Sequence, residues 1–175
     1  PTGVGQAPRP ARAELAAARA AVEKACGRLG RRLKVLIGKP GLDGHSNGAE
    51  QVAVRARDCG MEVVYEGIRS TPAEIVAAAA KEDVDLVGLS ILSGSHLSLA
   101  RAVLEGLRAR GLGHVPVVVG GIIPPEDAAA LRRDGAAAIY TPKDFRLNDI
   151  MIEIARLASR ANDTGSDETS AGARA

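Results

Sequence analysis

The sequence predicts an α/β fold in which helices cover a parallel β-sheet. Aromatic residues make up only 2% of the 175 residues and Trp is absent, whereas hydrophobic residues make up 46%. The core must therefore be built from Val, Ile, Leu and Ala, which is typical of parallel sheets buried on both faces. Short apolar runs also alternate with segments of helical period along most of the chain. The length allows one well-buried domain with short extensions.

The first 32 residues precede this alternation. Residues 1–11 contain three Pro and two Gly and are predicted to be a flexible lead. Residues 12–32 are predicted to form one amphipathic helix, an N-terminal helical extension, because their apolar positions share a helical face. These positions are Leu15, Ala18, Val22, Ala25 and Leu29. A single helix is not a domain, so the domain itself is predicted to span residues 33–159.

Five apolar runs are predicted to be strands, and each is followed by a predicted helix. The runs are Leu33–Gly38, Met61–Glu66, Asp85–Ser90, Val115–Val119 and Ala136–Tyr140. Two helices have recognisable first turns, one with Thr71-Pro72 before Glu74 and one with acidic residues after Pro125, at the positive end of the helix dipole. Residues 160–175 are rich in Gly, Ser, Thr, Asp and Ala and are predicted to be a disordered tail.

The strict alternation predicts a doubly wound, flavodoxin-like sheet. Right-handed crossovers between parallel strands make 2-1-3-4-5 the expected order of the five strands. Ligands of such sheets bind at the carboxyl ends of the strands. Polar residues and glycines that follow the strands are therefore the candidates for a functional site.

The segment Lys39–Gly48, after the first predicted strand, is the richest in such residues. Its ten residues include three Gly and one His. Asp-Gly and Asn-Gly are ordinary turn dipeptides, but a connection between a strand and a helix needs only a few residues, so a functional loop is favoured. Asp43 could orient the imidazole of His45 toward a metal, with Lys39 supporting Asp43. Gly44 and Gly48 would let the backbone approach a bulky ligand.

Hydroxyl residues and glycines also follow three further strands. They are Ser90 and Ser93 after the third strand, Gly120 and Gly121 after the fourth, and Tyr140 and Thr141 after the fifth. Each has a simpler interpretation, since Ser93 or Ser95 could cap a helix and the glycine pair could form a tight turn before Pro124. Four strand ends at one edge of the sheet together predict a binding site.

These residues resemble a known family. Asp43-Gly44-His45-Ser46-Asn47-Gly48 fits the Asp-x-His-x-x-Gly signature of cobalamin-binding domains, and Ser90-x-Leu92 and Gly120-Gly121 fit its second and third elements. Residues 33–158 resemble the acyl-CoA mutases related to methylmalonyl-CoA mutase. Within that group, their amino-acid sequence is most similar to the ethylmalonyl-CoA mutases.

The resemblance implies a base-off, histidine-on cofactor site. The dimethylbenzimidazole of the cofactor leaves the cobalt, His45 becomes the lower axial ligand, Asp43 is its hydrogen-bond partner and Lys39 supports Asp43. The nucleotide tail of the cofactor enters a slot between the first and third strands. The residues implied in cofactor binding are Lys39, Asp43, Gly44, His45, Ser46, Asn47, Gly48, Ser90, Leu92, Ser93, Gly120, Gly121, Tyr140 and Thr141.

The same resemblance implies adenosylcobalamin as cofactor and a radical rearrangement of an ethylmalonyl-CoA or methylmalonyl-CoA type of substrate. The family binds its acyl-CoA in a TIM barrel of roughly 250 residues, for which this chain has no room. We therefore expect the cobalamin-binding subunit or domain of a mutase, inactive without the barrel. Residues 12–32 would then be its linker or docking helix. Residues 1–34 hold eight of the 23 basic residues but two of the 21 acidic ones, which favours an acidic partner.

Other function classes fit less well. A stand-alone corrinoid carrier for methyl transfer or sensing is the main alternative, although such carriers usually have a four-helix cap before the domain and residues 1–32 offer one helix. A phosphoacceptor receiver would need Asp where Ser90 stands. A dinucleotide site would need Gly-x-Gly-x-x-Gly, and Pro40 removes an N–H group that a phosphate would use.

Several further classes are excluded by composition and spacing. The body of the chain lacks the basic and aromatic clusters of nucleic-acid-binding proteins. His96 and His114 lack zinc spacing, and Cys26 and Cys59 lack paired spacing. Without a signal peptide or an apolar run of membrane-spanning length, a cytoplasmic location is expected.

Overall fold

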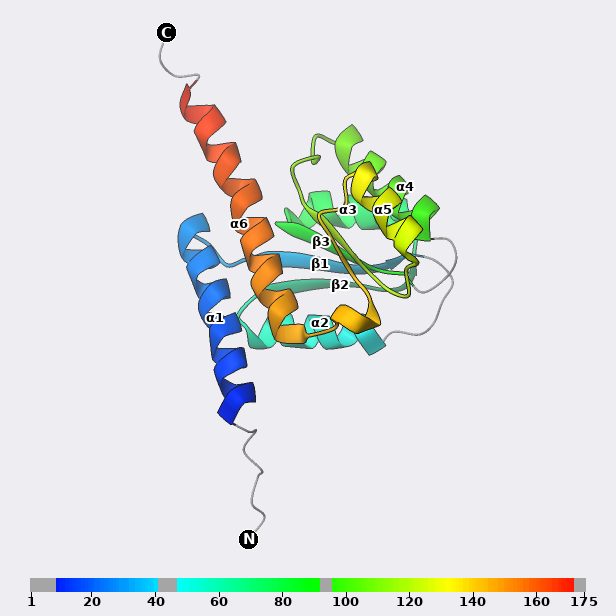
Figure 1. Ribbon diagram of the computed structural model, residues 1–175. Helices are drawn as coiled ribbons and strands as arrows, with labels where there is room; N and C mark the ends of the chain where they lie inside the picture. Colours follow the sequence, from blue (N-terminus) through cyan, green and yellow to red (C-terminus); the bar gives the residue numbers. More distant parts are fainter. Residues whose placement is uncertain (1–8, 41–46, 92–95, 172–175) are drawn as a thin grey trace.

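The computed structural model describes residues 9–40, 47–91 and 96–171. Five parallel strands form one sheet in the order β2-β1-β3-β4-β5, which confirms the predicted flavodoxin-like topology (Figure 1). The strands are β1 Lys34–Pro40, β2 Glu62–Ser70, β3 Leu86–Ser90, β4 Val117–Gly120 and β5 Ala138–Tyr140. The helices are α1 Arg9–Leu29, α2 Asn47–Asp58, α3 Pro72–Glu82, α4 His96–Ala109, α5 Pro125–Asp134, the 3-10 helix η1 Pro142–Asp144 and α6 Leu147–Ala171.

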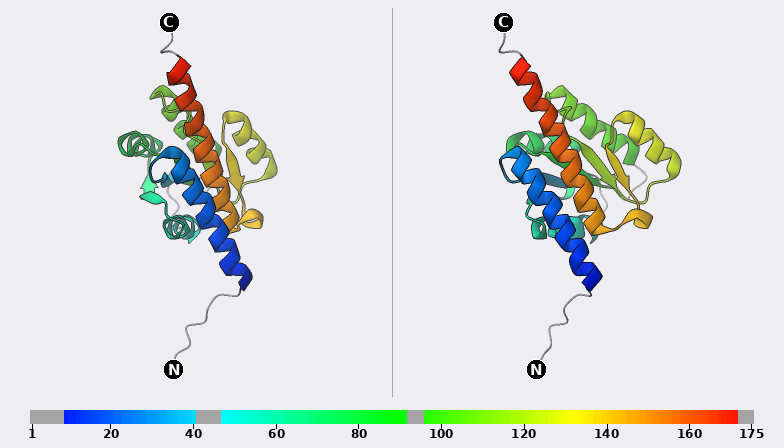
Figure 2. Two further views of the ribbon diagram at one scale, coloured as in Figure 1. Left: turned by 90° about the vertical axis from the view of Figure 1, so that its left-hand side faces the viewer. Right: turned by 60° about the vertical axis from the view of Figure 1, so that its left-hand side comes forward.

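The two faces of the sheet pack against different helices, because successive residues of a strand point to opposite faces. Leu36 and Val87 belong to a core shared with α3, α4 and α5. Val35 and Leu86, their neighbours in sequence, belong to a core shared with α1, α2 and α6. Figure 2 shows the layer that contains α1 and α6, which lie side by side along the sheet. Each fully buried aliphatic side chain stabilises such a core by about 1.5–3 kcal/mol.

Local signals place the helix starts where the sequence predicts them. The Thr71 hydroxyl accepts a hydrogen bond from the Glu74 N–H group at 3.1 Å, and Pro72 occupies the first turn of α3. Pro125 likewise begins α5, with acidic residues in its first turn. α4 begins at His96.

Helix α1, the predicted N-terminal helical extension, packs into the core. Ala18, Val22 and Ala25 are at most 3% exposed and share a core with Ile154 and Ala158 of α6. The boundary between a docking helix of residues 12–32 and a domain of residues 33–159 stays a prediction. α1 also begins earlier than expected, at Arg9, because Pro10 is compatible with the first turn of a helix.

Helix α6 also differs from the prediction at its end. The sequence predicts a disordered tail from residue 160, whereas α6 continues through Ala171. The first turns of α6 are already held by α1 and the sheet. Because nucleation is the costly step of helix formation, each further residue adds to an existing helix at little cost, even where its intrinsic helix propensity is modest.

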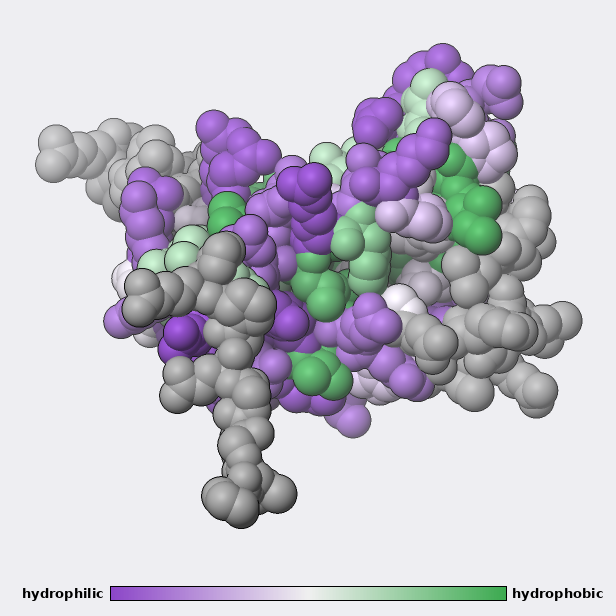
Figure 3. Space-filling model, turned by 60° about the horizontal axis from the view of Figure 1, so that its bottom comes forward, coloured by the Kyte–Doolittle hydropathy of each residue, from purple (hydrophilic) through white to green (hydrophobic). Residues whose placement is uncertain are grey.

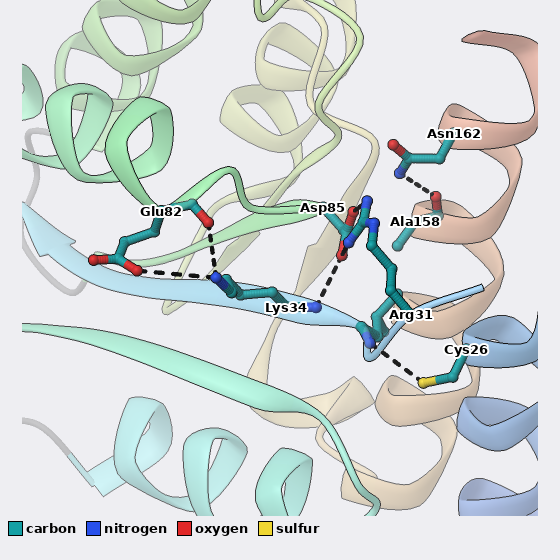
Figure 4. Close-up of polar contacts among 8 residues, drawn as sticks. Cys26, Arg31, Lys34, Glu82, Asp85, Ala158 and Asn162 are labelled. Atoms are coloured by element: carbon teal, nitrogen blue, oxygen red, sulfur yellow. Dashed lines mark hydrogen bonds and ion pairs between the residues drawn. The ribbon is translucent and has the colours of Figure 1, made fainter. Parts of the chain in front are cut away.

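A polar cluster around Asp85 ties α1 to the amino edge of the sheet (Figure 4). Asp85 is 2% exposed and accepts hydrogen bonds from both terminal nitrogens of Arg31, 2.7 Å from Nη1, and from the backbone N–H of Lys34 at 2.9 Å. The Lys34 ammonium in turn donates to the carbonyl of Glu82 at 3.0 Å. The hydrogen bond that Arg31 donates to the Asp85 carboxylate raises the pKa of Arg31. This cluster therefore joins the connection after α1 to β3 and α3.

Substitutions in this cluster are expected to lower the free energy of unfolding by different amounts. Arg31→Met leaves a buried carboxylate with one backbone donor, so the free energy of unfolding should fall by about 2–3 kcal/mol, below the range for fully buried pairs because Arg31 is partly exposed. Asp85→Asn keeps an acceptor for Lys34 and should cost less. The double variant should be more stable than Arg31→Met alone, as measured by urea unfolding. Wild-type stability of Arg31→Met would contradict this role.

Candidate functional site

A cavity of about 360 Å³ opens at the carboxyl edge of the sheet, on the face covered by α2 and α6. Six of the predicted site residues line it: Gly48, Ser90, Gly120, Gly121, Tyr140 and Thr141. They come from the start of α2 and from the ends of three strands. The predicted meeting of the strand ends is therefore present in the structure.

Two rows of residues across the sheet form the floor of the cavity. In the first row, Ile37 of β1 pairs with Gly88 of β3, which pairs with Val118 of β4. In the second row, two residues further along, Ser90 pairs with Gly120 and Gly120 with Tyr140. Residues two apart in a strand face the same side, so both rows face the cavity.

The glycines of the floor serve different purposes. Among the described residues, a Cβ atom at Gly120 would meet only the carbonyl oxygen of Tyr140 within 4 Å, at 3.7 Å, so these residues leave the space above it open. A Cβ atom at Gly88 would lie 3.0 Å from Cδ1 of Ile37. At Gly121 a Cβ atom would lie 2.0 Å from the carbonyl oxygen of Ile91. Gly121 is therefore required by the approach of two backbone segments, whereas Gly120 leaves room in the cavity.

The walls of the cavity are apolar. Ala49 and Val52 of α2 form one wall, and Ile150 and Ile154 of α6 form the other. None of these four residues is a polar residue or a glycine at a strand end, so the sequence pattern did not predict them. The spacing of Ile150 and Ile154, four residues apart, was the signal that could have shown them on one helical face.

Apolar residues are also exposed at the mouth of the cavity. Ile122 is 69% exposed and Phe145 is 37% exposed, and both line the cavity. Figure 3 shows apolar side chains at the surface among hydrophilic ones on the face seen from the bottom of Figure 1. An exposed apolar rim of this kind is typical of a surface that a ligand or a partner covers.

Two hydroxyl groups at the end of β5 are held by carboxylates. The Tyr140 hydroxyl donates a hydrogen bond to Oε1 of Glu153 on α6 at 2.7 Å. The Thr141 hydroxyl donates to Oδ2 of Asp144 at 2.9 Å. Burial, and then the hydrogen bond to Glu153, raise the pKa of Tyr140 far above its ordinary value. Tyr140 is therefore a neutral hydrogen-bond donor at physiological pH.

The remaining predicted residues are placed only in part. Lys39 lies on β1, two residues after Ile37, and is 3% exposed. Asp43, Gly44, His45, Ser46, Leu92 and Ser93 lie outside the described residues, and so does the side chain of Asn47. Residues 41–46 connect the end of β1 to the start of α2, where Gly48 and Ala49 line the cavity.

The described part of the chain holds no group of three or more His, Cys, Asp or Glu side chains that could bind a metal ion. Both cysteines, Cys26 and Cys59, are free. Among the helices of this part, none combines the length and the apolar composition needed to cross a membrane.

Comparison with known proteins identifies a family profile, "B12 binding domain", that matches residues 33–145. The chain is 61% identical over 160 residues to ethylmalonyl-CoA mutase of Cereibacter sphaeroides, covering 91% of this chain but 24% of that protein. It is 40% identical over 131 residues to the 2-hydroxyisobutanoyl-CoA mutase small subunit of Aquincola tertiaricarbonis, covering 73% of this chain and 96% of that subunit. The chain thus spans about a quarter of one relative and nearly all of the other.

Solved structures show the same fold. A cobalamin-binding protein of Desulfitobacterium hafniense DCB-2 aligns with a TM-score of 0.63 and 25% identity over 72% of this chain and 59% of that one. A response regulator receiver domain of Methanospirillum hungatei JF-1 aligns with a TM-score of 0.58 and 15% identity over 76% of this chain and 98% of that one. The receiver likeness shows the fold alone, and the family profile favours a corrinoid site over the receiver and dinucleotide alternatives.

Proposed function

Because this chain belongs to the B12-binding domain family, we propose that it holds adenosylcobalamin for an acyl-CoA mutase, with the nucleotide tail of the cofactor in the cavity at the carboxyl edge of the sheet. The observation that carries this proposal is the cavity itself. Gly120 leaves room above its floor, and its walls are aliphatic except for Gln51. A volume of about 360 Å³ with apolar walls and a few polar groups suits a flat aromatic base.

The assignment of the cobalt ligand follows the sequence signature. His45 would ligate the cobalt in place of the dimethylbenzimidazole, Asp43 would orient its imidazole, and Lys39 would support Asp43. An acceptor on the second ring nitrogen fixes the tautomer of a metal-bound histidine and raises its basicity. The buried position of Lys39 on β1, next to the segment that contains Asp43, is consistent with this role.

The remaining residues would act on the nucleotide tail. Ser90 and Thr141 would offer hydroxyl groups at the slot, and the sequence signature assigns Leu92 and Ser93 to the same cofactor. Gly120 would leave space for the base, and Tyr140 would form the far wall. When bound, adenosylcobalamin supplies a cobalt–carbon bond that breaks homolytically, which is chemistry of the cofactor and not of the side chains. The contribution of this chain would be to hold the cofactor in one position and one ligation state.

A partner would supply the substrate site. The relative from Cereibacter sphaeroides is about four times as long as its matched segment, and the relative from Aquincola tertiaricarbonis is a separate small subunit. We infer that an acyl-CoA of the ethylmalonyl-CoA or methylmalonyl-CoA type binds in a barrel domain or subunit outside these residues. The exposed apolar rim at Ile122 and Phe145 would be covered in that assembly.

Titration of the full 175-residue chain with adenosylcobalamin, followed by a mutase assay, tests this function. We expect tight binding of the cofactor by the chain alone and isomerisation of ethylmalonyl-CoA or methylmalonyl-CoA only after a barrel subunit from a related mutase is added. Failure of the chain to bind any corrinoid would contradict the proposal. Preferential binding of methylcobalamin, with methyl transfer to a methyltransferase partner, would instead support the alternative of a stand-alone corrinoid carrier.

A further inference from the structure

Tyr140 stands between two cavities of opposite character. Tyr140 and Ile150 line the apolar cavity and also a second cavity of about 420 Å³. The other walls of this second cavity include the charged residues Arg132, Asp144, Asp149 and Glu153. The second cavity lies at β5, which is the last strand of the sheet. Figure 2 shows β5 between α5 and α6. Tyr140 and Ile150 are therefore the residues that the two cavities have in common.

The ring is held from α6. Its hydroxyl donates to Oε1 of Glu153 at 2.7 Å, and the other carboxylate oxygen of Glu153 lies 3.9 Å from Nη2 of Arg156. Glu153 precedes Ile154, which forms the apolar wall, so one turn of α6 contributes both the wall and the hydrogen-bond acceptor. Burial, and then the hydrogen bond to Glu153, raise the pKa of Tyr140, as expected for a neutral phenol that donates to a carboxylate.

We propose that Glu153 is a positioning residue for corrinoid binding, which fixes the Tyr140 ring as the partition between the two cavities. This inference rests on the proposed function, because it concerns the slot for the nucleotide tail. Glu153 does not line the apolar cavity and acts only through Tyr140. A ring held by this bond is already ordered before the ligand arrives, so binding does not have to immobilise it.

Loss of the bond would weaken binding because water could then reach the apolar cavity. A phenol hydroxyl without its acceptor would turn toward water or toward another polar group, and the polar cavity with Asp144 and Asp149 lies on that side. The apolar cavity would then open toward water. An apolar base gains most from a cavity that excludes water, so the nucleotide tail would lose part of its binding free energy.

Binding titrations of the full chain with two corrinoids test this role. Aquocobalamin carries the nucleotide tail, whereas diaquocobinamide lacks it and cannot fill the slot. We expect Tyr140→Phe and Glu153→Leu each to weaken aquocobalamin binding by about tenfold, the equivalent of one hydrogen bond, with cobinamide binding unchanged. Glu153→Gln keeps an acceptor oxygen and should bind almost as the wild-type chain does. The double variant Tyr140→Phe/Glu153→Leu should be no weaker than either single variant, since both remove the same bond.

Controls separate this role from a general effect on folding. Glu105→Leu removes an exposed glutamate from α4, on the opposite face of the sheet, and should leave both corrinoids unaffected. Tyr140→Phe is conservative enough to keep the test valid if Glu153→Leu does not fold. Unchanged aquocobalamin binding by Tyr140→Phe, or equal weakening of both corrinoids, would contradict the role of Glu153 but leave the proposed function standing. Binding of neither corrinoid by the wild-type chain would overturn the proposed function as well.

Discussion

A chain with Gly120→Val is expected to bind aquocobalamin about 10- to 100-fold more weakly than the wild-type chain while it keeps its fold. The Cβ atom would enter space that the described part of the chain leaves open, where the Tyr140 carbonyl oxygen is its one neighbour within 4 Å. The two further methyl groups of Val would then occupy the slot proposed for the base. Overfilling a well-packed site typically costs about 1–3 kcal/mol, which corresponds to this range of affinity.

Size and ligand controls make this prediction specific. Gly120→Ala should have a smaller effect than Gly120→Val, because it adds one carbon atom. Diaquocobinamide should bind equally well to all three chains, since it has no nucleotide tail, and the unfolding midpoint should not fall. Gly121 cannot serve as a probe, because its Cβ atom would clash with the Ile91 carbonyl at 2.0 Å. Equal binding of aquocobalamin by Gly120→Val and the wild-type chain would show that the tail lies elsewhere.

A chain with His45→Ala is expected to lose at least about 100-fold in affinity for both aquocobalamin and diaquocobinamide. Even substitutions of groups that only support a metal ligand cost 10- to 100-fold in many sites, and loss of the ligand itself should cost no less. Without His45 the dimethylbenzimidazole keeps its place on the cobalt, so the tail is not free to enter the slot. The absorption spectrum of any bound aquocobalamin should then be that of the base-on form.

Comparison with a second histidine variant isolates this effect. His114 is exposed and precedes β4, at the edge of the sheet away from the cavity, so His114→Ala should bind both corrinoids normally. His45→Ala should weaken both corrinoids, whereas Gly120→Val should weaken only the one with a tail. A base-off, histidine-coordinated spectrum from the His45→Ala chain would remove His45 from the site.

The strand order and helix starts could be predicted because they depend on local patterns. The five apolar runs alternate with amphipathic helices, and parallel crossovers of one hand leave few possible orders. Thr71 with Pro72 at the start of α3 is a purely local signal, and the structure confirms it. The partner of α1 was harder to predict. Its apolar face would look the same whether it bound another protein or, as the structure shows, α6 of its own chain.

The site could be predicted only in part for a similar reason. Gly120 and Gly121 are both glycines, so the sequence does not distinguish their roles. The roles differ because the backbone of Gly121 lies close to the Ile91 carbonyl and that of Gly120 does not. Ile150 and Ile154 come from a helix that follows the last strand, so only the packing of α6 on the sheet brings them to the cavity. Glu153 acts on the site through Tyr140, which is 13 residues away in sequence. Contacts of this kind depend on the tertiary fold and leave no local pattern.

The most direct test of the cofactor site is the electron paramagnetic resonance spectrum of cob(II)alamin bound to the full chain, with histidine carrying the heavy nitrogen isotope. If His45 ligates the cobalt, labelling changes the nitrogen superhyperfine pattern from a triplet to a doublet, and His45→Ala removes the change. If the triplet persists in the labelled chain, the dimethylbenzimidazole remains on the cobalt, and the base-off, histidine-on site proposed for this domain is contradicted.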